Sequence, residues 1–139
     1  SKDDKIILGA DLKKSKDIVL PAYNDSQGLT SAFNLNLLSR INTELDADFN
    51  TELFVHTPMY DEQEGVAKSA IKSTVNQEVE IKVLDMKVAF KKEEQIHTEI
   101  SRKYDDISIQ NICLDTGLKI VGKITDSKNY FADYIIEKQ

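Results

Sequence analysis

The sequence lacks the residues that several classes of site require. One cysteine, Cys113, and two histidines, His56 and His97, are too few for a disulfide framework or a Cys/His zinc site within one chain. Its five glycines contain no Gly-x-Gly pair, so these residues hold no dinucleotide- or phosphate-binding loop. No apolar run approaches the roughly 20 residues of a membrane-spanning helix. With no signal peptide at the start, we expect a cytoplasmic protein without a membrane span.

Basic residues are also in the minority. The 139 residues include 24 Asp and Glu against 18 Lys and Arg, for a net charge of −6. A protein that neutralises phosphates usually has the opposite bias, so we expect no nucleic-acid partner. The chain is 40% hydrophobic and 30% charged, which suits one domain with an ordinary core and argues against disorder of the whole.

The first third of the sequence predicts a strand and a helix. Residues 5–12 form a continuous apolar strand of the kind that is covered on both faces in a parallel sheet. Residues 13–28 are polar and rich in turn formers, so we interpret them as a connection. An amphipathic helix is expected over residues 30–45, with Thr30 near its N-cap. Its apolar stripe recurs every four residues, at Leu29, Phe33, Leu37 and Ile41.

The spacing of apolar residues changes in the middle of the chain. After a possible short helix near residues 50–54, the alternation over residues 66–101 has a period of two. This pattern predicts four strands in an antiparallel meander, the last of them at residues 95–101.

The end of the chain returns to alternating helix and strand. Asp105 or Asp106 is expected to cap a helix that Gly117 ends in a left-handed conformation. Two strands, at residues 118–125 and 131–137, follow. The predicted fold class is therefore an α/β sheet, built from residues 5–12 and 103–138, that is interrupted by an α+β module over residues 13–102 with an antiparallel sheet.

The strand at residues 95–101 carries a row of hydrogen-bonding groups. Because side chains alternate along a strand, Gln95, His97, Glu99 and Ser101 share one face. From the pattern alone, a solvated sheet face is the more common outcome. The alternative is a polar pocket wall, in which Glu99 accepts a hydrogen bond from a cationic or imidazole-bearing ligand and Ser101 bonds beside it.

Two further residues are candidates for a pocket. Asn34 falls inside the apolar stripe of the predicted helix, so its amide is expected to be buried and to bond either the 23–25 loop or a ligand. Tyr23 is amphipathic and suits a pocket as well as a loop. Cys113 lies on the apolar side of its helix and is expected in the core rather than as a nucleophile.

Three ordered segments resemble a known family. They are AYNDSQGLTSAFNLNLL at residues 22–38, NTELDADF at residues 42–49 and IHTEISRKY at residues 96–104. Together they are similar to the C-terminal part of the histidine-specific S-adenosylmethionine-dependent methyltransferases, the family of an ergothioneine-pathway enzyme that methylates the α-amino group of histidine. The resemblance implies a class I methyltransferase sheet interrupted by a substrate-recognition module, with residues 8–12 in the fifth strand.

The resemblance also implies roles for particular residues. Tyr23 would contact the carboxylate side of the amino-acid substrate, and Glu99 and Ser101 would bind the imidazole. Ser69, a further substrate-binding candidate, stands where the family leads us to expect a methionine beside the substrate, a departure that bears on the identity of the substrate. The loop and acidic residue that bind S-adenosylmethionine would lie upstream of residue 1, so this part alone is expected neither to bind the cofactor nor to be active.

Two functions therefore follow from the sequence. The first is the C-terminal part of a methyltransferase that acts on a small amino acid, with histidine expected. The alternative is a non-catalytic binding module, or a family member that has lost activity. In either case, the unpaired edge of a divided sheet is expected to drive homo-oligomerisation through residues 5–12 or 118–137.

Overall fold

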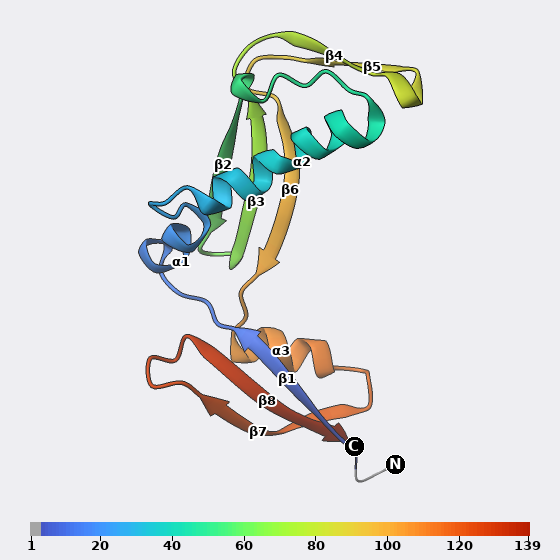
Figure 1. Cartoon of the computed structure of the whole chain (residues 1–139). Coiled ribbons are helices and arrows are strands. Elements are labelled where there is room, and N and C mark those ends of the chain that lie inside the picture. The colour runs from blue at the N-terminus through green and yellow to red at the C-terminus, as the bar shows by residue number, and fades with distance from the viewer. Residues whose placement is uncertain (1–3) are drawn as a thin grey trace. The chain divides into compact units, whose positions relative to one another are not determined.

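The computed structural model describes residues 4–139, a mixed α/β structure with antiparallel sheets (Figure 1). Its helices are α1 (Lys16–Tyr23), α2 (Leu29–Leu45) and α3 (Asp106–Cys113). The strands are β1 (Lys5–Asp11), β2 (Phe54–Asp61), β3 (Val66–Ser73), β4 (Gln77–Ile81), β5 (Met86–Phe90), β6 (Gln95–Arg102), β7 (Leu118–Thr125) and β8 (Phe131–Lys138). No helix over these residues is long and apolar enough to cross a membrane.

The chain divides into two compact units. Within the described residues, the first contains residues 4–16, 61–66 and 101–139, and the second contains residues 17–60 and 67–100. Each unit has its own sheet, and each has buried side chains of its own.

The first unit is a three-stranded sheet with α3 on one face. Its strand order is β1-β8-β7, and β8 is antiparallel to both neighbours. The buried face carries the alternate residues of β1 and β8, and Ile109 and Cys113 of α3 pack against it. The members of this core are Ala10, Leu12, Ile109, Cys113, Ala132, Tyr134 and Ile136. Cys113 is thus a core residue, as predicted.

The environment of β1 differs from the prediction. The strand pairs with β8 in the antiparallel sense, not within a parallel sheet. Its two faces are not both covered, because Ile6 and Ile7 are 49% and 73% exposed. A short apolar run does not specify the direction of its partner, and here the partner comes from the far end of the chain.

Helix α3 begins where its cap predicts. The Asp105 carboxylate accepts the Ser108 N–H at 2.8 Å, and the Ser108 hydroxyl accepts the Asp105 N–H at 2.8 Å, which forms a capping box. The prediction for the other end was only partly right. The helix ends at Cys113, and left-handed residues Asp115 (φ 58°) and Gly117 (φ 73°) shape the turn after it.

The second unit holds a three-stranded sheet and a separate two-stranded ribbon. The sheet order is β2-β3-β6, while β4 pairs only with β5. The predicted single meander of four strands is therefore wrong, because β2, which the alternation did not reveal, lies beside β3. Three phenyl rings, those of Phe49, Phe54 and Phe90, pack with centroids 5.5 to 6.0 Å apart in the core.

Helix α2 has nearly the predicted length but a different buried face. Its fully buried side chains are Asn34 and Leu38. Leu29 and Phe33 of the predicted stripe are 65% and 80% exposed. Helical spacing alone does not distinguish an apolar stripe that packs from one that remains open.

The start of α2 also differs from the prediction. Thr30 lies inside the helix, and Asp25 provides the cap. The Asp25 carboxylate accepts the N–H groups of Leu29 and Thr30 at 2.9 and 2.8 Å. These bonds lower the pKa of Asp25 to about 2.

Part of the predicted connection over residues 13–28 is helical. Helix α1 occupies Lys16–Tyr23, and its Val19 is buried against Tyr60 and Ala67. The polar composition concealed this helix, because only one of its residues is buried.

Candidate functional site

The carboxylate of Glu99 is supported by a buried hydroxyl. Glu99 lies on β6 and is exposed, whereas Ser69 of β3 is completely buried. The Ser69 hydroxyl donates to Glu99 Oε2 at 3.5 Å. The structure thus brings together two of the predicted site residues and holds one acceptor oxygen of Glu99 near the sheet.

Glu99 also lines a small pocket beside α2. The cavity has a volume of about 260 Å³. Its wall combines a carboxylate, a guanidinium, two amides and a phenyl ring, in the residues Phe33, Asn34, Asn36, Leu37, Arg40, Thr98 and Glu99. Such a mixture suits a small molecule with a ring and polar groups.

Asn34 joins the helix to the strand that carries Glu99. Its side chain is 5% exposed, as predicted. The amide donates to the Thr30 carbonyl oxygen at 2.9 Å, and its oxygen accepts the Thr98 hydroxyl at 2.5 Å. The predicted buried amide therefore supports the pocket wall by linking α2 to β6.

Tyr23 lies at the end of α1. It is partly buried and packs against the cluster formed by Val19, Tyr60 and Ala67. Its role toward a substrate carboxylate stays a prediction.

His56 belongs to the same unit, and the sequence shows no evident partner for it. Its Nε2 and the hydroxyl of Tyr60 are buried without a hydrogen-bond partner within residues 4–139. Burial lowers the pKa of His56, although the charges of Glu99 and Asp25 act in the opposite direction. Burial of His56 therefore favours its neutral form.

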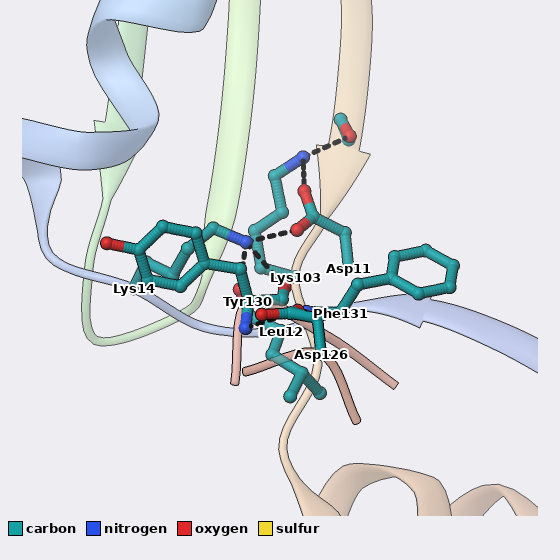
Figure 2. A network of polar contacts seen from close by, with 8 residues as sticks. Asp11, Leu12, Lys14, Lys103, Asp126, Tyr130 and Phe131 are labelled. Atoms are coloured by element: carbon teal, nitrogen blue, oxygen red, sulfur yellow. Dashed lines mark hydrogen bonds and ion pairs between the residues drawn. The ribbon is translucent and has the colours of Figure 1, made fainter. Parts of the chain in front are cut away.

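Ser101 lies two residues beyond Glu99 on β6 and belongs to the first unit. Figure 2 shows the polar network of Asp11, Lys14 and Lys103 that adjoins this end of β6. Lys103 is 5% exposed, and its Nζ donates to Ser101 Oγ at 3.0 Å. The same Nζ lies 2.8 Å from Asp11 Oδ2.

Asp11 connects two ammonium groups. Its other oxygen, Oδ1, accepts a hydrogen bond from Lys14, which also donates to the carbonyl oxygens of Leu12 and Tyr130 at 3.0 and 2.8 Å. Burial raises the pKa of Asp11, but the hydrogen bonds and charges of Lys103 and Lys14 outweigh that effect and hold it below its ordinary value. The carboxylate is therefore ionised at neutral pH.

The sequence held one signal for this network that the prediction did not use. Lys103 continues the polar alternation of Glu99 and Ser101 by one further step along the chain. No comparable signal linked Asp11 and Lys14 to them, because these residues come from the opposite end of the sequence.

Comparisons with known proteins agree with the resemblance in the motifs. A family model described as histidine-specific, SAM-dependent methyltransferase matches residues 1–138. The chain is 32% identical over 128 residues to histidine N-alpha-methyltransferases of Mycolicibacterium smegmatis and Mycobacterium tuberculosis, covering 92% of this chain and 40% of each relative. It is 26% identical over 137 residues to ergothioneine biosynthesis protein 1 of Schizosaccharomyces pombe, covering 98% of this chain and 18% of that protein.

Proposed function

The chain belongs to the family of histidine-specific, SAM-dependent methyltransferases, and on that premise we propose that it carries the amino-acid-binding part of an enzyme that methylates the α-amino group of histidine. It spans about 40% of the length of its bacterial relatives. In this proposal, Glu99 and Ser101 bind the imidazole, Tyr23 contacts the carboxylate side of the amino acid, and Ser69 and Asn34 support the site.

The observation that carries the proposal is the placement of Glu99. Its carboxylate lines a pocket of about 260 Å³ together with the ring of Phe33, and the buried Ser69 hydroxyl orients one of its oxygens. An ionised carboxylate accepts a hydrogen bond from an imidazole N–H, and an aromatic ring packs against an imidazole ring. The pocket has a size that suits a single amino acid rather than a larger ligand.

The reaction assigns a positioning role to these residues. S-adenosylmethionine supplies the methyl group when it is bound. The amine that attacks must be unprotonated and aligned with that group, and alignment is the main contribution that a binding site makes to such a transfer. Glu99, Ser101 and Tyr23 would provide it by fixing both ends of the amino acid.

Two features support the proposal that these residues do not themselves hold the cofactor. The sequence contains no Gly-x-Gly pair. A Cβ at Gly9 would lie 2.8 Å from the Phe131 ring, and one at Gly65 would lie 2.5 Å from the Lys13 side chain, so both glycines already serve contacts within the chain. We propose that S-adenosylmethionine binds the part of the enzyme outside these residues, and that this part alone is inactive.

The sheet of the first unit supports a finer proposal about the fold. Because β8 is antiparallel to both β1 and β7, the latter two run in the same direction. We propose that β1-β8-β7 is one side of a class I methyltransferase sheet, formed by residues 5–12 and 103–138 and interrupted by the module at residues 13–102.

One observation favours a second candidate function. Ser69 occupies the place where the family resemblance leads us to expect a methionine, and its hydroxyl contacts Glu99. A site changed in this way is compatible with a non-catalytic module that binds a small ligand. A full-length sequence that lacks a glycine-rich cofactor loop would favour this alternative.

Replacement of Glu99 in the full-length protein tests the proposed function. Loss of a hydrogen bond to a charged group costs about 1.5–3 kcal/mol, so Glu99→Ala should weaken histidine binding by about 10- to 150-fold. The affinity for S-adenosylmethionine should remain nearly unchanged, and both affinities can be measured by calorimetry. Glu78→Ala, which removes an exposed carboxylate on β4 of the same unit, is the matched control. Equal histidine binding by the wild type and Glu99→Ala would refute the assignment.

A further inference from the structure

We propose that Lys103 is a positioning residue that makes Ser101 a hydrogen-bond donor toward the substrate. This inference rests on the proposed function, in which Ser101 binds the imidazole. It assigns a role to a buried lysine that has no assigned part in binding, and it specifies which form of the imidazole the site accepts.

The geometry determines the direction of one hydrogen bond. An ammonium group has three donors and no acceptor, whereas a serine hydroxyl has one donor and two lone pairs. At 3.0 Å from Lys103 Nζ, the Ser101 oxygen must therefore accept. The Ser101 hydrogen consequently points away from Lys103. The adjacent positive charge polarises the hydroxyl and strengthens it as a donor to another acceptor.

Lys103 is held in place by the rest of the network. Its ammonium is paired with Asp11 at 2.8 Å, and its side chain is almost completely buried. Lys14 occupies the other oxygen of Asp11 and is itself fixed by two backbone carbonyls (Figure 2). The charge pair is therefore anchored to the backbone, and the pairing with Asp11 holds the Lys103 ammonium beside Ser101.

A fixed donor at Ser101 selects the atom that faces it. That atom must be an acceptor, and in an imidazole the only acceptor in the ring plane is the unprotonated nitrogen. An imidazolium has N–H groups at both nitrogens, and the charge of Lys103 also repels it. The donor at Ser101 accordingly selects the neutral imidazole, with its lone pair toward Ser101.

Steady-state kinetics of the full-length enzyme test this role. Lys103→Met should raise the KM for histidine about tenfold, as expected for one lost hydrogen bond, and should leave kcat within about twofold, because a loss of uniform binding raises KM alone. Lys103→Arg keeps a charged donor and should restore most of the affinity. Lys13→Met removes another lysine of the same unit that is paired with an aspartate, Asp105, and is the matched control.

A double-mutant cycle separates this inference from the proposed function. In a Ser101→Ala background, Lys103→Met should cause no further rise in the KM for histidine, because the lysine acts through the hydroxyl. Additive effects of the two changes on KM would overturn the inference, and so would an unchanged KM in Lys103→Met. Neither outcome would affect the proposed function, which Glu99→Ala tests separately. If both Glu99→Ala and Ser101→Ala bind histidine as the wild type does, the proposed function itself fails.

Folding of the variant must be verified by its melting curve. If Lys103→Met does not fold, the double variant Asp11→Asn/Lys103→Met removes both charges of this pair, while Lys14 keeps its hydrogen bonds to the carbonyl oxygens of Leu12 and Tyr130. The same rise in KM is expected from it, and the same comparison with Ser101→Ala applies.

Discussion

At the scale of single residues, aspartates define the starts of two helices. Asp25 binds the first N–H groups of α2, and Asp105 does the same for α3. Both carboxylates have a lowered pKa, to which hydrogen bonds from backbone N–H groups contribute. These caps explain why the helices begin where they do even though their apolar stripes differ in how well they pack.

The lowered pKa of Asp25 makes the free energy of unfolding depend on pH in the acidic range. Its pKa is about 2 in the folded chain against an ordinary value of 3.8. A carboxyl whose pKa falls on folding contributes stability above its unfolded pKa, and that contribution is lost as the pH falls through the folded value. Between pH 4 and pH 2, Asp25→Asn should therefore lose less stability than the wild type, as measured by urea unfolding. An identical pH dependence would contradict the assigned cap.

Asn34 provides a second test at this scale. Asn34→Ala removes the hydrogen bonds that the buried Asn34 amide makes to Thr30 and Thr98. The expected decrease in the free energy of unfolding is about 1–3 kcal/mol. Asn36→Ala, on an exposed position of the same helix, should change it by less than about 0.5 kcal/mol. Equal effects of the two variants would show that the Asn34 amide contributes nothing specific.

At the scale of elements, the cap of α3 and the strand alternation were predictable, whereas the cap of α2 and the sheet partners were not. The start of α3 and the approximate extents of α2, β7 and β8 follow from local signals, because capping residues and short-period alternation act over a few residues. The pairing of β2 with β3 and the separation of the β4-β5 ribbon from that sheet could not be predicted from the sequence. Strand pairing depends on contacts between distant segments.

The same distinction applies to the candidate site. The burial of Asn34 followed from helical spacing, and the position of Glu99 on a strand followed from alternation. The exposure of Phe33 and the partners of Ser101 depend on tertiary contacts with distant residues. The sequence therefore predicted which residues carry the polar groups, but not which charges orient them.

The capping box of α3 gives a prediction for an element. Asp105→Ala removes the acceptor for the Ser108 N–H, and such replacements cost about 1 kcal/mol of stability. Because α3 covers one face of the β1-β8-β7 sheet, amide hydrogen exchange in that helix should accelerate. Gln110→Ala, on an exposed position of the same helix, is the control and should leave exchange unchanged. Unchanged exchange in Asp105→Ala would contradict the assigned role of the box.

At the scale of the whole molecule, β1 is an edge strand within residues 4–139. One edge pairs with β8, and the other meets only Tyr104 near the end of the strand. Ile7 on this strand is 73% exposed, and Ile124 on β7 is 62% exposed. We propose that two copies associate through this sheet, because an open edge with apolar neighbours is a template for pairing.

Sedimentation at micromolar concentration tests this association, with a dimer as the expected species. The charge of −6 opposes it, but exposed charges more than about 8 Å apart are largely screened at physiological salt. Ile7→Lys should give a monomer, whereas Val83→Lys, at a similarly exposed position on the other unit, should not. A wild-type chain that sediments as a monomer would contradict the proposal.

The central claim is that these residues bind the amino acid that a SAM-dependent enzyme methylates. The most direct test is mass spectrometry of the product formed when the full-length protein is incubated with S-adenosylmethionine and an equimolar mixture of amino acids. We predict that histidine alone gains methyl groups, all on its α-amino nitrogen, and that Glu99→Ala greatly reduces this product. Methylation of a different amino acid in preference to histidine, or no methylated amino acid from a folded protein that binds S-adenosylmethionine, would contradict the account.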